Sequence, residues 1–203
     1  IRIENIIKKY SDHITHSVYI LESDAKDQKE EKINQGTALW NKDKKDIKKE
    51  EYEEFYTNIG PNYDKPWKVI HNKIEGSLNY TNLIFIPSEK PFDLLNSEKT
   101  CNLKLFIKKI FITDKLENIL PKYLRFVSGI IDSEDISLNI SREMLQNDPV
   151  VAKIKSHLTK KVLSELKKEL KNSKDNYINF WKNFGSVMKE GIHEDYSNKE
   201  NIL

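Results

Sequence analysis

A continuous apolar run at residues 83–86 (LIFI), bounded by Asn82 and Pro87, constrains the fold of this chain more than any other segment. A strand with one face in water alternates apolar and polar side chains, whereas an unbroken run of this length is typical of a strand covered on both faces. Such a strand requires an apolar layer on each side of its sheet. The run therefore favours an α/β fold with helices on both faces of the sheet.

Further strands are expected elsewhere in the chain. Leu103, Leu105 and Ile107 alternate with Lys104 and Lys108, which predicts a strand there. Continued alternation would place Ile110 and Ile112 on the lysine face, so we expect either a bulge near residues 108–109 or burial on both faces further along. Strands are also predicted at residues 16–21 and 136–140, the second after a turn at 132–135.

Some segments are less clearly defined by their pattern. Residues 123–131 are apolar with Gly129 inside, and their periodicity does not decide between helix and strand. Between residues 24 and 32 only Ala25 is apolar, so we expect a mobile surface loop there.

Two helices are predicted before the apolar run. Residues 3–10 carry apolar side chains at helical spacing. Residues 52–59 carry a second apolar stripe, which Asp46 can cap and Gly60 can end.

Two more helices are predicted near the end of the chain. Pro149 follows Asp148, a pair typical of a helix start, and an apolar stripe then runs over residues 151–170. A further helical region covers residues 177–188 and is rich in aromatic side chains.

The charge of the chain is high but balanced. Lysine and arginine number 34 against 32 aspartates and glutamates, and the net charge is +2. This balance is typical of a solvated, salt-bridged surface and argues against a dedicated nucleic-acid-binding face. Cys101 is the only cysteine, which excludes a disulfide framework within the chain and fits a reducing compartment, the cytoplasm. The five histidines are scattered and no apolar run approaches the ~18 residues of a membrane span, so we expect no metal site and no membrane segment.

Arginine is scarce in this chain. Only Arg2, Arg125 and Arg142 occur among the 34 basic residues. Codon bias toward lysine explains this scarcity. Under such bias, a retained arginine favours a position where lysine cannot substitute, because the planar guanidinium forms paired hydrogen bonds to carboxylate or phosphate. We interpret Arg125 as a structural or surface guanidinium, for which lysine would preserve near-normal activity.

The residues around Arg142 suggest a phosphate contact. If residues 142–146 form one helical turn, Arg142 and Gln146 project to the same side, and Asn139 precedes them on the polar face of the expected strand. A guanidinium and two amides directed at one point could hold a terminal phosphate. Alternatively, Arg142 pairs with Glu143 or caps a neighbouring helix, and the residues alone leave these alternatives open.

Long stretches of the chain resemble the middle domain of the ninety-kilodalton heat-shock protein chaperones, bacterial type. They run in the order of the family over nearly the whole chain: residues 38–40 (ALW), 51–56 (EYEEFY), 86–87 (IP), 91–94 (PFDL), 110–114 (IFITD), 123–127 (YLRFV), 132–135 (DSED), 138–146 (LNISREMLQ), 180–181 (FW), 184–185 (FG) and 189–191 (KEG).

The resemblance implies a fold and a domain organisation. It implies a three-layer helix-sheet-helix α/β domain over residues 1–171, similar to a domain of ribosomal proteins. The start of a helical coil would follow at residues 172–203. An ATP-binding domain upstream and a dimerisation domain downstream would lie outside this chain, and we expect it to be a segment of a longer protein.

The resemblance also implies a catalytic role for the loop at Arg142. In this family the matching arginine reaches the γ-phosphate of ATP when two domains dock, and the positions of Gln146 and Asn139 support that loop. The ATP and its Mg²⁺ would be held mainly by the upstream domain.

Other implied sites are surfaces. The aromatic matching Phe92 lies on a patch that helps the upstream domain to dock, and Trp40 belongs to a surface implicated in conformational coupling. The region of Trp181 and Phe184 is implied to contact client proteins, although their spacing on one helical face also fits inward packing of both. The implied partners are therefore unfolded or partly folded clients, the protein's own ATP-binding domain and a second subunit of a homodimer.

Two other functions are compatible with the composition. One is a nucleic-acid-binding domain, suggested by the many lysines and the ribosomal-type fold, and the other is a scaffold recognised by shape. Acidic residues interleave with the lysines, so no stripe of one sign emerges. A steep loss of RNA affinity with rising salt would distinguish the first alternative from the chaperone hypothesis.

We expect this chain alone to bind ATP negligibly and to hydrolyse none above background. It has no glycine-rich phosphate loop, no nucleophile elbow and no paired metal-binding histidines. Titration calorimetry with ATP and Mg²⁺ checks this, and stoichiometric binding would contradict the interpretation as a segment.

Overall fold

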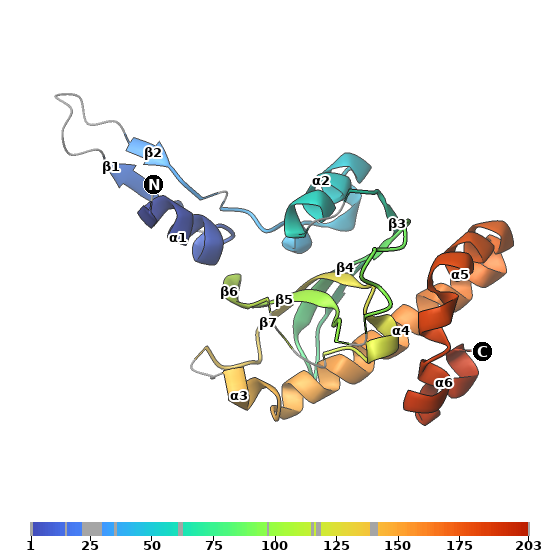
Figure 1. The fold of residues 1–203 in the computed structure, drawn as a ribbon. Coiled ribbons are helices and arrows are strands. Elements are labelled where there is room, and N and C mark those ends of the chain that lie inside the picture. Colours follow the sequence, from blue (N-terminus) through green and yellow to red (C-terminus); the bar gives the residue numbers. More distant parts are fainter. Residues whose placement is uncertain are drawn as a thin grey trace.

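The centre of the structure is a five-stranded mixed sheet in the order β3-β4-β7-β5-β6 (Figure 1). The structure is a computed structural model that describes residues 2–14, 16–21, 30–34, 36–60, 63–96, 98–114, 116, 119–138 and 142–202, with the backbone alone for Lys9 and Arg142. Strands β5 and β7 are parallel, and the other neighbouring strands of this sheet are antiparallel. The strands are β3 (Pro66–Ile74), β4 (Tyr80–Pro87), β5 (Asn102–Ile107), β6 (Ile110–Thr113) and β7 (Ser128–Ser133).

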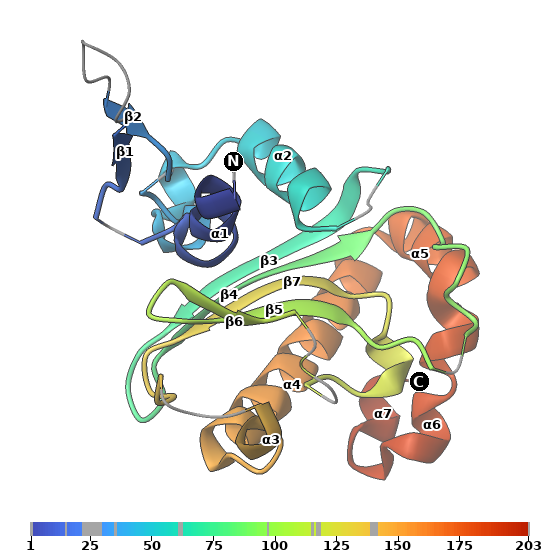
Figure 2. The same cartoon turned by 60° about the vertical axis from the view of Figure 1, so that its left-hand side comes forward.

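Helices cover both faces of this sheet. Helices α1 (Arg2–Ser11) and α2 (Lys49–Ile59) lie on one side, and α4 (Pro149–Asn172) crosses the other side, as Figure 1 and Figure 2 show. The predicted three-layer helix-sheet-helix fold is therefore confirmed.

Strand β4 belongs to two hydrophobic cores at once. All eight of its residues are buried, which confirms the strand predicted from the apolar run. Leu83 and Phe85 pack into a smaller core with α2, whereas Ile84 and Ile86 pack into the main core with α4. Full burial of each such side chain contributes roughly 1.5–3 kcal/mol, so this one strand holds the three layers together.

Helix α2 begins differently from the prediction. Asp46 does not cap it, because Asp46 ends a separate 3-10 turn, Lys44–Asp46. The first turn of α2 is instead closed by Glu51, whose carboxylate accepts the backbone N–H of Lys48 at 3.0 Å. The helix ends at Ile59 and is followed by Gly60, as predicted.

Helix α4 begins as predicted. The Asp148 carboxylate accepts the backbone N–H groups of Val150 and Val151 at 2.7 and 3.1 Å, and Pro149 occupies the first turn, where no intrahelical partner is needed. Among the described residues, no helix is long and apolar enough to cross a bilayer.

The conflict between residues 103–107 and residues 110–112 is resolved by a hairpin. Lys108 and Lys109 have φ values of 50° and 68°, so the chain reverses there and β6 pairs antiparallel with β5. Positive φ at two consecutive residues suits a two-residue hairpin turn. The expected bulge is not at residues 108–109, and a register irregularity lies between Leu105 and Phe106 instead.

Residues 123–131, whose periodicity does not decide between helix and strand, contain part of a helical turn followed by part of a strand. A 3-10 turn, η3 (Lys122–Leu124), leads after three residues into β7. The strand predicted at residues 136–140 is wrong for residues 136–138, which are not in a strand, and residues 139–140 lie outside the described residues. Where the chain leaves the sheet, the Asp135 carboxylate accepts the N–H of Asn79 at 2.6 Å.

The N-terminal region contains a small separate ribbon. Strand β1 (Tyr19–Leu21) pairs antiparallel with β2 (Glu30–Lys32), so the strand predicted at 16–21 is shorter than expected. The surface loop predicted at residues 24–32 is wrong for residues 30–32, which form β2, and its other residues lie outside the described part of the chain.

Helices at the C-terminal end pack onto the same main core as α4 and the sheet. They are α5 (Lys174–Met188), α6 (Gly191–Glu194) and α7 (Lys199–Ile202), and the first confirms the helix predicted at 177–188. Their buried members include Phe180, Phe184 and Ile202. The division of the chain at residues 171 and 172 coincides with the end of α4 and stays a prediction.

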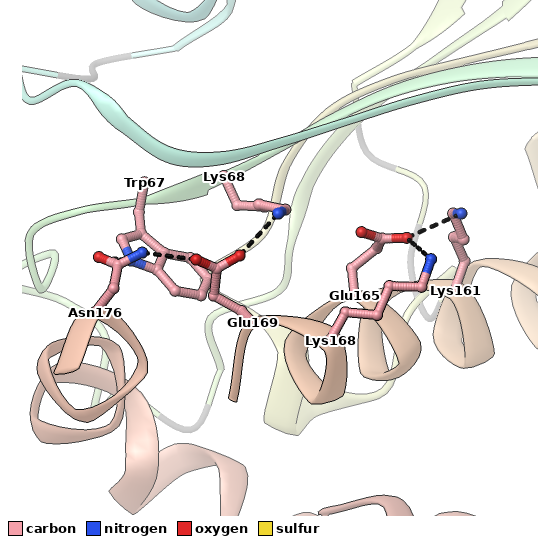
Figure 3. A network of polar contacts seen from close by, with 7 residues as sticks. All are labelled: Trp67, Lys68, Lys161, Glu165, Lys168, Glu169 and Asn176. Carbon is pink, nitrogen blue, oxygen red and sulfur yellow. Dashed lines mark hydrogen bonds and ion pairs between the residues drawn. The ribbon is translucent and has the colours of Figure 1, made fainter. Parts of the chain in front are cut away.

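A polar network fixes α5 against α4 and β3 (Figure 3). Glu169 of α4 accepts the ammonium of Lys68 and the amide of Asn176, both at 2.9 Å. Asn176 in turn accepts the indole N–H of Trp67 at 2.8 Å, and the Trp67 ring stacks on Phe180. We call these contacts the β3 junction.

We expect Gly129→Ala to destabilise the fold by roughly 3 kcal/mol or more, because strain and overpacking act together there. Gly129 has a φ of 145°, and a Cβ at this position would lie 2.2 Å from the carbonyl oxygen of Leu83 in β4. Gly76→Ala is the matched control, because Gly76 has a φ of 140° and nothing lies within 4 Å of its added Cβ. Urea unfolding of both variants measures the difference, and equal losses of stability would contradict the close contact of β7 with β4.

Candidate functional site

The segment that carries the candidate arginine contains a short helix, α3 (Arg142–Leu145), beside the start of α4 (Figure 2). Leu145 is 1% exposed and anchors this helix in the main core. The N–H of Asp148 then bonds to the carbonyl of Leu145 at 3.4 Å, which leads the chain into α4. Gln146 is exposed directly after the turn that begins at Arg142. The expected helical turn at this segment is thus present.

The backbone at the start of α4 is already occupied. The first amides of α4 already bond to Asp148, which also adds a negative charge, so the helix start does not offer an anion site. The sequence has a guanidinium at position 142 and an amide at position 146, two side-chain types whose chemistry suits phosphate oxygens. Asn139 and the side chain of Arg142 lie outside the described residues, so their convergence with Gln146 stays a prediction.

A second candidate surface surrounds Phe92. The ring of Phe92 is fully exposed in a tight turn, and Tyr63 nearby in the same cavity wall is 98% exposed. A cavity of about 760 Å³ lies between this turn and the strand ends, and Arg125 and Phe126 are in its wall. Large apolar rings that face solvent beside a cavity are typical of an interaction surface.

The turn at residues 91–96, which we call the Phe92 turn, is held in a defined shape. The N–H of Leu94 donates to the carbonyl of Pro91 at 3.1 Å, and Lys99 pairs with Asp93. Leu94 itself is completely buried in the main core. The structure therefore presents Phe92 on a fixed support.

Trp40 does not lie on a surface. It is 1% exposed, and the prediction that it belongs to a coupling surface is wrong in this structure. Its indole N–H donates to the carboxylate of Asp132 at 2.8 Å, and its ring contacts His13 and Phe106. Burial raises the pKa of Asp132, an effect that the bond from Trp40 partly offsets.

The two aromatic residues expected at a client surface differ in exposure. Phe184 is completely buried and packs against Phe180 and Phe126, so the prediction that it lies on a surface is wrong. Trp181 is partly exposed, and its ring stacks on Tyr177 with 6.1 Å between the centroids.

Arg125 is a structural guanidinium, and the surface alternative is wrong. It is 3% exposed, and its Nη1 and Nη2 donate to the two carboxylate oxygens of Glu190 at 2.5 and 2.7 Å. Its Nε donates to the carbonyl of Leu94 at 2.7 Å, and Nη1 also donates to the carbonyl of Lys122 at 3.1 Å. Arg125 holds the pKa of Glu190 below its usual value, chiefly through these hydrogen bonds.

Cys101 is not arranged as a nucleophile. Its thiol is buried, and burial raises its pKa to about 12, so the reactive thiolate is scarce at neutral pH.

Comparisons with known proteins identify the family. A family model described as Hsp90 protein matches residues 22–203. The chain therefore belongs to the Hsp90 protein family.

Particular relatives are chaperone proteins named HtpG. That of Orientia tsutsugamushi is 48% identical over 100% of this chain and 32% of the relative. That of Roseobacter denitrificans is 47% identical over 100% of this chain and 31% of the relative. That of Ehrlichia canis is 50% identical over 95% of this chain and 30% of the relative. The chain thus spans about a third of the length of these relatives.

A solved structure shares the fold. The middle domain of a heat shock protein from Plasmodium falciparum matches with a TM-score of 0.71 and 28% identity, over 81% of this chain and 64% of that chain. The match supports the assignment of this chain to a middle domain.

The sequence analysis missed two residues that support the Phe92 turn. Glu190 pairs with Arg125, and Asn183 donates its amide to the carbonyl of Ser88 at 2.8 Å. The scarcity of arginine was a signal for a special role of Arg125, but no local pattern indicates a partner 65 residues away.

We expect Arg125→Lys to lower the free energy of unfolding by about 2 kcal/mol, because an ammonium cannot reproduce the fork and a buried acceptor loses its donor. Urea unfolding measures this change. Arg2→Lys is the control, because Arg2 is exposed on α1 and surface substitutions usually change stability by less than about 0.5 kcal/mol. A change at Arg125 as small as that of the control would contradict the structural role.

Proposed function

We propose that this chain is the middle segment of an ATP-dependent molecular chaperone, in which it completes the ATPase site and contributes to client binding. Arg142 is the catalytic residue and is presented to the γ-phosphate, with Gln146 and Asn139 supporting the loop. The ATP and Mg²⁺ are held mainly by an upstream domain, and the protein works in the cytoplasm as a homodimer through a C-terminal domain. The observation that carries the proposal is the family membership together with the exposed, core-anchored turn at residues 142–146.

The physical basis of catalysis is electrostatic. Hydrolysis builds negative charge on the γ-phosphate oxygens, and a cation already in place lowers the barrier without reorganisation. The core anchor at Leu145 keeps the adjoining backbone in place, which favours such preorganisation. Since the main nucleotide pocket belongs to another domain, the site is completed only on docking, and ATP turnover is coupled to closure.

Phe92 supplies the apolar part of the docking surface in this proposal. Its ring is fully exposed, yet the turn beneath it is fixed by Leu94 and by hydrogen bonds. A rigidly held aromatic ring gains buried area on docking and loses little conformational entropy.

Client contact is assigned to Trp181 rather than to Phe184. Trp181 and Tyr177 form a partly exposed aromatic pair on α5, and Ile178 on the same helix is 40% exposed. Phe184 is excluded from direct contact by its burial, so it supports the helix from within the core.

A nucleic-acid-binding role is not favoured. The net charge is only +2. Several lysines are engaged by neighbouring carboxylates, as Lys68 is by Glu169 and Lys161 and Lys168 are by Glu165 (Figure 3). Paired charges of this kind attract phosphate backbones weakly.

In the full-length protein we expect Arg142→Ala to slow ATP hydrolysis by at least about tenfold. Loss of a hydrogen-bond donor to the transition state can cost more than this, but docking of the domains can itself limit turnover, so we expect the lower end of the range. Nucleotide affinity should change little, since most contacts belong to the upstream domain. Arg142→Lys should restore only part of the rate, because it keeps the charge but loses the planar fork.

Steady-state ATP hydrolysis and nucleotide titration measure these variants, and Arg2→Ala, at an exposed position on α1, serves as the control. A folded Arg142→Ala variant that turns over ATP at the parental rate would show that the catalytic assignment is wrong.

A further inference from the structure

The Phe92 turn is tied to the C-terminal helices at its N-terminal side by Asn183. This residue lies on α5, and its side-chain amide donates to the carbonyl of Ser88 at 2.8 Å. The backbone N–H of Ser88 is fixed in turn by the carboxylate of Asp64 at 2.7 Å. The chain therefore enters the turn from a residue whose carbonyl and amide are both held.

The other side of the turn is tied to the same helices through Arg125. The guanidinium Nε donates to the carbonyl of Leu94, and Nη1 and Nη2 donate to the carboxylate of Glu190. Glu190 lies between the end of α5 and the start of α6. Since Arg125 is 3% exposed, its buried hydrogen bond to the carbonyl of Leu94 faces little competition from water.

These bonds give the turn a direction that apolar burial does not supply. Leu94 is buried in the main core, but the hydrophobic effect is non-directional. Burial of Leu94 therefore holds the turn against the core without fixing which way its backbone faces. Hydrogen bonds to the carbonyls of Ser88 and Leu94 have preferred geometries, so they constrain how the backbone between them faces. Phe92 lies between these two carbonyls.

The β3 junction offers a comparison within the same molecule. It also fixes α5, through Asn176 and Glu169 (Figure 3). The contacts that define it include no residue of the Phe92 turn. The β3 junction thus holds the helix, whereas Asn183 and the Arg125–Glu190 pair hold both the helix and the turn.

We infer that Arg125, Glu190 and Asn183 are positioning residues that couple the placement of α5 and α6 to the orientation of the Phe92 turn. A movement of these helices then changes the surface offered to the docking domain. The inference rests on the proposed function only for the meaning of that surface, since the coupling itself can be measured without ATP.

Hydrogen exchange in the nucleotide-free full-length protein tests the coupling. Glu190→Gln keeps the volume of the side chain and removes the charge-assisted bonds to Arg125. We expect the exchange of the Leu94 and Asn96 amides, which close the turn, to accelerate by about tenfold. The amides of β4 should exchange as in the parent, which separates a local effect from a loss of global stability.

Glu169→Gln is the matched control, because it removes an ion pair of the β3 junction by the same chemical change. It should leave exchange in the turn unchanged. Unchanged exchange in Glu190→Gln, or equal acceleration in both variants, would overturn the coupling. If Glu190→Gln does not fold, Asn183→Ala gives the same readout, because it removes one neutral bond at a half-buried site.

A separate experiment tests the role of the turn in the proposed function. Phe92→Ala leaves the three positioning residues in place and tests in an ATPase assay whether the turn serves docking. Accelerated exchange in Glu190→Gln together with a parental rate in Phe92→Ala would support the coupling and remove the docking role from the turn.

Discussion

Side chains of β4 point alternately into two cores, Leu83 and Phe85 toward α2 and Ile84 and Ile86 toward α4. Neither helical layer can move away without exposing a face of this strand to water. Its neighbour β7 approaches closely because Gly129 has no side chain, so that the backbones of the two strands are in contact. The outer elements, including the turns of Phe92 and of residues 142–146, take their positions from this central pair of strands.

Elements whose cause is local could be predicted from the sequence. The apolar run defined β4, the Asp148–Pro149 pair defined the start of α4, and aromatic spacing defined α5. Features that depend on distant partners could not be predicted. The buried N–H of Trp40 donates to Asp132, 92 residues further along, and where residues 134–138 leave the sheet Asp135 bonds to Asn79.

The same distinction between local and distant causes applies to the candidate site. The helical turn at Arg142 follows from its own residues, and the exposure of Gln146 fits that pattern. The support beneath Phe92 does not, because it combines Ser88, Leu94 and Arg125 with residues of α5 and α6. An exposed aromatic residue is visible in a sequence only as an aromatic residue, and its exposure is a property of the assembled fold.

The burial of Arg125 has an evolutionary consequence. In a chain with so few arginines, composition favours the replacement of arginine by lysine. Most basic positions accept this replacement because their side chains are solvent-exposed. Position 125 does not, since the guanidinium there serves two carbonyls and one carboxylate at once. Arginine at this position and an acidic residue at position 190 should therefore be inherited together, and a lineage that loses one of them is released to change the other.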